Sequence, residues 1–131
     1  MRIRRKVGTV ISALSLLAGG AVAMASPASA VDVGGCPSDK LCLYRSTQFR
    51  TMEFAAASTS ACFNLANYGM GPGTNSVQSY VNNLTVKATF WYYLTGPGWV
   101  NSQTIGIEKF SSNAGLTFVG NEKVCTGSAR P

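Results

Sequence analysis

The chain is organised around the sequence CPSDKLCLYRSTQFRTMEF, from Cys36 to Phe54. This stretch opens with two cysteines, and a short apolar run follows the second one. A polar turn that carries Phe49 then leads to a second run that ends at Phe54. Two β-forming runs joined by a polar turn predict a β-hairpin. We expect the rest of the chain to close a small all-β domain over this hairpin.

The segments after the hairpin alternate between short β-forming runs and turn residues. The strongest run is TFWYYL, residues 89–94, and the turn GPG separates it from a return strand over 99–107. We also expect strands near 62–65 and 77–81 and a last pair within 110–119. About eight short strands and no helix are typical of a β-sandwich or a Greek-key domain.

The first thirty residues have the pattern of a secretory signal peptide. A basic start, MRIRRK, precedes an apolar run, and the sequence Ala-Ser-Ala ends at Ala30. We therefore expect cleavage after Ala30, secretion of residues 31–131 and no membrane attachment after cleavage. A chain of this length is enough for one domain.

The charge of the chain depends on that cleavage. The full sequence has a net charge of +6, whereas residues 31–131 keep seven basic and five acidic residues, a net charge of about +2. A nucleic-acid partner requires clustered lysines and arginines to neutralise phosphates. The basic residues after position 30 are scattered, which argues against such a partner.

All four cysteines, Cys36, Cys42, Cys62 and Cys125, follow the predicted cleavage point. An even number in a short exported chain indicates two disulfides, for which three pairings are possible. We favour a local Cys36–Cys42 ring and a long Cys62–Cys125 connection. The chain has no histidine and no CxxC pair, so we expect neither a zinc site nor another cofactor.

The pattern Tyr44-x4-Phe49-x-Thr51, followed by Ser79, resembles the βγ-crystallin Greek-key motif. In that motif the second aromatic packs back onto the bend, a glycine permits the tight backbone, and a serine pins the folded hairpin. Ser79 matches the pinning serine, but Thr51 stands where glycine is usual. The resemblance implies a βγ-crystallin-like Greek-key sandwich, as a single small disulfide-stabilised domain.

The second half of the chain repeats this motif loosely. Tyr93 is followed by Trp99 one position late, and Asn101 replaces the glycine. Many βγ-crystallin modules bind calcium, but the corresponding window, Asn75 to Tyr80, contains no acidic residue. Calcium prefers several oxygen ligands with carboxylates among them, so we expect no metal here.

The export signal, the CPxxxxCLY start and the single Greek-key domain are similar to those of the secreted actinobacterial metalloproteinase-inhibitor family of the Streptomyces type. The resemblance covers roughly Cys36 to Ile107. It implies a secreted inhibitor of thermolysin-like zinc metalloproteinases, and we expect the protein to be a monomer. Such a protein would act by tight binding of a rigid loop to an extracellular peptidase.

Two loops are candidates for the inhibitory bond. In one, the bridged Cys62 precedes Phe63; in the other, Gly98 and Trp99 end a rigid turn. Thermolysin-like enzymes favour a large apolar residue just after the scissile bond, and a disulfide or a stiff turn lowers the ordering cost of binding. The competing interpretations are core packing for Phe63 and a folded-back aromatic of the second Greek key for Trp99.

We do not expect an enzyme. Without histidine, the common base for a serine or cysteine nucleophile is absent, and no pair of carboxylates suggests a glycosidase. The alternative to an inhibitor is a secreted cell-wall or carbohydrate-binding protein with antimicrobial effect. In that protein one aromatic pair, Phe90 and Tyr92 or Trp91 and Tyr93, would stack on a sugar with Trp99 nearby. A third interpretation is a structural envelope protein.

Overall fold

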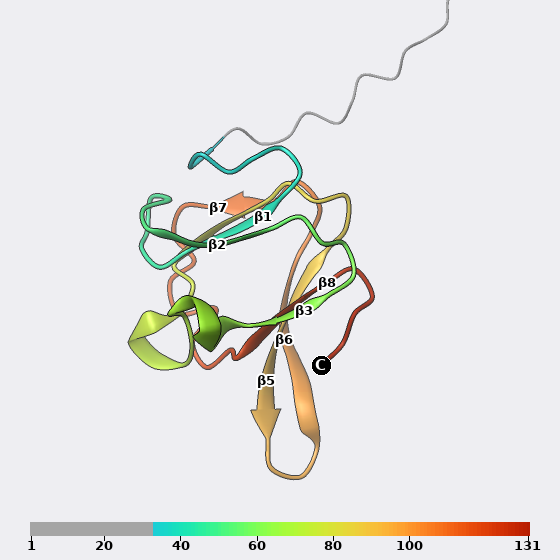
Figure 1. Cartoon of the computed structure of the whole chain (residues 1–131). Helices are drawn as coiled ribbons and strands as arrows, with labels where there is room; N and C mark the ends of the chain where they lie inside the picture. The colour runs from blue at the N-terminus through green and yellow to red at the C-terminus, as the bar shows by residue number, and fades with distance from the viewer. Residues whose placement is uncertain (1–32) are drawn as a thin grey trace, which may run out of the picture.

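A computed structural model describes residues 33–131, so the predicted signal peptide over 1–30 lies outside the described residues (Figure 1). The described part contains β-strands and two short 3-10 helices, and no α-helix. The strands are β1 (Leu41–Tyr44), β2 (Met52–Ala56), β3 (Cys62–Asn64), β4 (Ser79–Asn82), β5 (Ala88–Leu94), β6 (Gly98–Ile105), β7 (Phe110–Ser111) and β8 (Lys123–Thr126). The prediction of an all-β fold is confirmed.

The strands form two antiparallel sheets, in the orders β2-β1-β4-β7 and β3-β8-β5-β6. The two halves of the chain interlock, because β3 leaves the first half to pair with β8 and β7 leaves the second half to pair with β4. Figure 1 shows the first sheet above the second, with the β5–β6 hairpin extending beyond the rest of the domain.

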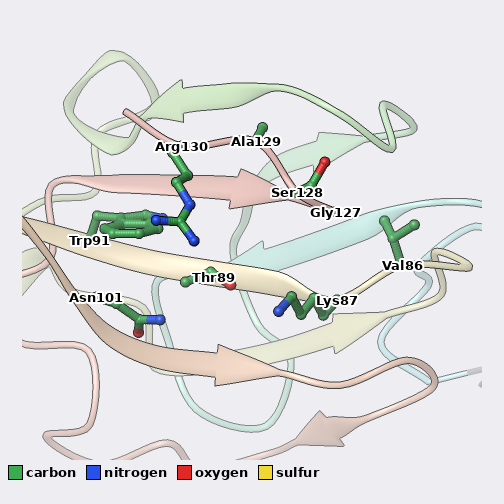
Figure 2. A pocket seen from close by; sticks show the side chains of 9 residues that line it. All are labelled: Val86, Lys87, Thr89, Trp91, Asn101, Gly127, Ser128, Ala129 and Arg130. Carbon is green, nitrogen blue, oxygen red and sulfur yellow. The ribbon is translucent and has the colours of Figure 1, made fainter.

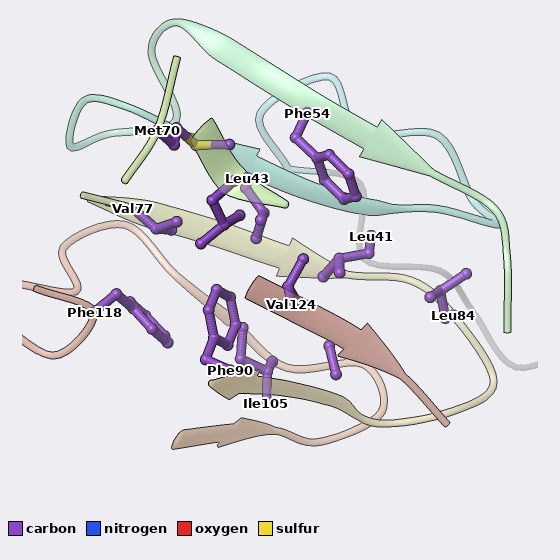
Figure 3. Close-up of a cluster of buried hydrophobic side chains, with 12 residues drawn as sticks. Leu41, Leu43, Phe54, Met70, Val77, Leu84, Phe90, Ile105, Phe118 and Val124 are labelled. Carbon is purple, nitrogen blue, oxygen red and sulfur yellow. The ribbon is translucent and has the colours of Figure 1, made fainter. Parts of the chain in front are cut away.

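The core lies between the two sheets (Figure 3). It is formed by alternate residues of the strands, because successive side chains of a strand point to opposite faces. On β1, Leu41 and Leu43 enter this core, and on β5 Ala88 and Phe90 do so. The other buried members are Phe54, Leu65, Met70, Val77, Leu84, Ile105, Phe118 and Val124.

The opposite face of β1 is buried as well. Cys42 and Tyr44 form a second cluster with Cys36 and Val81, and Phe49 packs against it. The Cys36–Cys42 disulfide holds the segment before β1 over this face, with the two Cα atoms 5.9 Å apart. This cover explains why all four residues of β1 are buried.

The second disulfide joins Cys62 on β3 to Cys125 on β8, with a Cα–Cα distance of 4.0 Å. The two residues are direct partners in the antiparallel register. Both favoured pairings are thus present, and all cysteines after residue 32 are paired.

The prediction of a last strand pair within 110–119 was wrong. Strand β7 stops at Ser111, and β8 begins only at Lys123. The residues between them form turns, in which the Thr117 N–H donates to Ala114 and the Val119 N–H donates to Leu116. Only Phe118 of the apolar residues in 116–119 is buried, whereas Leu116 is 84% exposed, so this segment has no strand-like alternation.

Candidate functional site

The bend between β1 and β2 folds back on itself and is fixed by Ser79. The Ser79 hydroxyl accepts a hydrogen bond from the Phe49 N–H at 3.1 Å and donates one to the Ser46 carbonyl at 2.7 Å. The Phe49 ring packs edge-on against Tyr44, with centroids 5.6 Å apart. The predicted roles of Phe49 and Ser79 are confirmed by these contacts.

Thr51 takes the backbone conformation that the motif usually assigns to glycine. Its φ is +57°, and Gln48 and Phe49 are also left-handed, at +58° and +55°. Left-handed angles cost an L-residue roughly 1–2 kcal/mol each. The bend therefore forms without glycine because Ser79 and the Tyr44–Phe49 contact compensate for its strain.

The β5–β6 hairpin is the most prominent surface feature of the fold. Its strands pair from Ala88 opposite Ile105 to Leu94 opposite Gly98. Its tip projects beyond the rest of the domain (Figure 1). Tyr93 and Leu94 beside the tip are 53% and 44% exposed. Because β6 is the last strand of its sheet, its outer edge carries backbone groups that pair with no strand in residues 33–131.

Side-chain contacts brace the hairpin on one face. Tyr93 lies opposite Trp99 in the register, and their rings meet edge-on at 5.4 Å. The Lys123 ammonium lies 4.5 Å from the centre of the Trp99 ring, a cation–π contact. The Glu122 carboxylate accepts a hydrogen bond from the Tyr93 N–H at 3.3 Å. Trp99 is thus a cross-strand partner, and it does not fold back over a bend as Phe49 does.

The other candidate bond, Cys62–Phe63, lies within the body of the domain. Strand β3 pairs with β8, and the Phe63 ring packs edge-on against Phe54 at 5.0 Å. Phe63 is half-buried and contacts the core. The structure therefore places the two candidate bonds on different elements, and only the one at Gly98 and Trp99 lies at a projecting tip.

A pocket of about 400 Å³ lies on the outer face of the second sheet (Figure 2). Thr89 and Trp91 line it because they alternate along β5 with Ala88 and Phe90, which point into the core. The remaining lining residues are Val86, Lys87, Asn101, Gly127, Ser128, Ala129 and Arg130. Sequence reasoning singled out Trp91 as a possible contact but did not identify the pocket, whose far wall is the C-terminal segment.

The cations of this pocket have no acidic partner. In the described part of the chain the one ion pair is Arg45–Glu53, at 2.9 Å. No aspartate or glutamate lines the pocket, so Lys87 and Arg130 leave a net positive charge there. The Trp91 indole N–H is buried and has no hydrogen-bond partner among residues 33–131.

Comparisons with protein-family models, curated proteins and solved structures found no match to this chain. Within residues 33–131, no three His, Cys, Asp or Glu side chains gather where they could hold a metal ion. The same residues contain no helix long and apolar enough to cross a membrane.

Proposed function

We propose that this protein is a secreted inhibitor of an extracellular peptidase, with a thermolysin-like zinc metalloproteinase as the target. The tip of the β5–β6 hairpin is the inhibitory element. The observation that carries this proposal is the braced, projecting hairpin, which presents an exposed apolar residue and a free strand edge. The protein acts by binding alone.

The mode of action follows from how peptidases hold their substrates. An extended peptide pairs with the enzyme through its backbone, as in other cases of strand addition. A free strand edge beside a rigid tip offers such a backbone with little ordering cost on binding. The Tyr93–Trp99 and Lys123–Trp99 contacts supply the rigidity.

Leu94 is the residue that fits the apolar specificity pocket of the enzyme best. It is 44% exposed at the tip, whereas Trp99 is held between Tyr93 and Lys123. Phe63 is less suitable because its ring packs on Phe54. We therefore assign the principal contact to the hairpin tip, with Leu94 as the inserted side chain and Trp99 as its brace.

The fold proposed for this inhibitor is the βγ-crystallin-like Greek-key sandwich. Three features support this assignment: the exchange of β3 and β7 between the halves, the Ser79-pinned bend and the Tyr44–Phe49 packing. Two disulfides in the described chain agree with an oxidising, extracellular location. We expect the protein to act as a monomer after removal of residues 1–30.

The experiment is a titration of thermolysin with the purified, oxidised protein, followed through residual peptidase activity. The proposal predicts tight, stoichiometric inhibition that is lost after reduction of the disulfides. A parallel titration of subtilisin, a serine peptidase, tests the metalloproteinase assignment. If a panel of secreted metallo- and serine peptidases keeps full activity with excess protein, the inhibitor function is wrong.

A further inference from the structure

We propose that the pocket at Trp91 and Arg130 is a second binding site, specific for an acidic sugar. This site lies on the outer face of the second sheet and does not include the hairpin tip. The proposal is independent of peptidase inhibition, since the lining residues include neither Leu94 nor the Tyr93, Trp99 and Lys123 side chains that brace the hairpin.

An aromatic surface lies next to the pocket. Directly paired residues of antiparallel strands share a face of the sheet. Trp91 pairs with Asn101 on one side and Lys123 on the other, and Tyr93 pairs with Trp99. Trp91, Tyr93 and Trp99 therefore occupy the same outer face, and of the three only Trp91 lines the pocket. Its ring can stack on the apolar face of a sugar ring.

The pocket also carries positive charge. Lys87 and Arg130 line the pocket without an acidic partner, and Figure 2 shows the Arg130 side chain reaching toward the Trp91 ring. Guanidinium groups bind carboxylates through paired, charge-assisted hydrogen bonds. A ligand that carries a carboxylate beside a sugar ring would match both Arg130 and Trp91.

Neutral polar side chains also line the pocket. Thr89, Asn101 and Ser128 provide hydroxyl and amide groups around the pocket, as the hydroxyls of a sugar require. The Trp91 indole N–H is shielded from the pocket and has no acceptor in the described part of the protein. It is therefore not a ligand contact, but a sugar lying on the Trp91 ring would change the magnetic environment of this proton.

The C-terminal segment that forms the far wall is held in place. The Gly127 N–H donates to the Lys87 carbonyl at 2.8 Å, and the Ala129 N–H donates to Thr126 at 3.2 Å. Gly127 has a φ of +63°, and a Cβ there would lie 2.3 Å from the Thr59 carbonyl oxygen. Glycine thus lets the segment turn closely past Thr59 and places Arg130 beside Trp91.

The test uses the trimer of galacturonic acid as the probe and the neutral galactose trimer as its comparison. Binding is followed through the NMR signal of the Trp91 indole N–H, assigned from its loss in W91F. We expect a saturable shift with the acidic trimer, and much weaker binding of the neutral one. Arg130→Gln should weaken binding about tenfold or more, because it removes a charge-assisted contact.

Arg50→Gln is the matched control, since Arg50 is an exposed arginine outside the pocket and its loss changes the net charge equally. It should leave binding of the acidic trimer unchanged. The proposal is overturned if the acidic and neutral trimers bind equally, if inorganic phosphate gives the same affinity as the acidic trimer, or if R130Q and R50Q behave alike.

The two sites can be distinguished by testing the variants of each site in both the sugar-binding and the peptidase-inhibition assay. Arg130→Gln should leave thermolysin inhibition unchanged, and Leu94→Ser should leave binding of the acidic trimer unchanged. Absence of any peptidase inhibition would not affect the sugar titration, so failure of the proposed function and failure of this inference give different results.

Discussion

Ser79 on β4 holds the Phe49 backbone, thirty positions earlier, by a hydrogen bond of 3.1 Å from the Phe49 N–H to the Ser79 hydroxyl oxygen. The same hydroxyl donates to the Ser46 carbonyl. The bend after β1 is therefore closed by a residue of another strand, and its conformation depends on the completed sheet.

Ser79→Ala should destabilise the fold by about 1–3 kcal/mol, because it leaves the Phe49 N–H and the Ser46 carbonyl without their partner. Chemical denaturation of the oxidised protein measures this loss. Ser58→Ala is the control, since Ser58 is exposed and accepts only a hydrogen bond of 3.4 Å from the Ser60 N–H. Equal stability of S79A and wild type would contradict the pinning role.

Thr51→Gly should stabilise the protein by about 1 kcal/mol. Thr51 is a β-branched residue with a φ of +57°, and glycine adopts this conformation without a steric penalty. The backbone strain removed from the folded state exceeds the free-energy cost of the extra conformational entropy that glycine gives the unfolded chain, but only by a small margin. Thr85→Gly, at an exposed residue without a positive φ, should instead lower stability. A lower midpoint for T51G in a denaturant titration would show that the bend carries no such strain.

Removal of the Cys62–Cys125 disulfide should cost more stability than removal of Cys36–Cys42. The two bridges close sequence separations of 63 and 6 residues. In the chain-entropy model they contribute about 4.3 and about 2.4 kcal/mol. Paired replacement by alanine, with thermal unfolding as the measurement, compares them directly. If removal of Cys36–Cys42 lowered stability more, the segment that this disulfide holds over β1 would contribute more to stability than the Cys62–Cys125 connection.

Stability should decline above about pH 10. Burial raises the pKa of both Tyr44 and Tyr80 above the ordinary value of 10.0. Between the tyrosine pKa of the unfolded state and that of the folded state, the folded protein keeps protons that the unfolded chain has lost. The free energy of unfolding is therefore fully retained below the unfolded-state pKa and falls as pH rises through the folded-state pKa. Tyr80→Phe should reduce this decline, as measured by unfolding midpoints from pH 8 to pH 11. Tyr93→Phe, at an exposed site, serves as the comparison, and an identical decline in Y80F would refute the assignment to Tyr80.

Local sequence patterns predicted the strands well where β-forming residues were concentrated between turn residues. The run 89–94 and its return strand were identified, as was the hairpin that starts at Leu41. The strand pair predicted within 110–119 failed because the apolar residues there do not share one face. Phe118 enters the core while Leu116 and Val119 stay exposed. Strand β8 pairs with β5 and β3, which are distant from it in the sequence, and local sequence patterns do not predict such pairings.

The candidate site was harder to predict than the fold. Gly98 and Trp99 could be proposed from the GPG turn, but their position on a projecting hairpin required the sheet order. The pocket brings Lys87 and Arg130, far apart in the sequence, to the same side of Trp91. That juxtaposition depends on the close passage of Gly127 past Thr59, which isolated residue types do not reveal.

The inhibitor proposal depends on the exposed apolar side chain at the hairpin tip. Leu94→Ser removes that side chain, and Leu116→Ser is its matched control, because Leu116 is also exposed but lies in the turns between β7 and β8. Both replacements should leave the folded structure intact, which the thermal unfolding midpoint of each variant verifies.

The most direct measurement is the inhibition constant for thermolysin of the oxidised wild type, L94S and L116S. We predict that L94S binds about tenfold or more weakly than wild type, because an apolar side chain no longer enters the enzyme's specificity pocket. L116S should match the wild type. Equal inhibition by L94S and L116S, or no inhibition by the wild type, would contradict the assignment of peptidase inhibition to the β5–β6 hairpin.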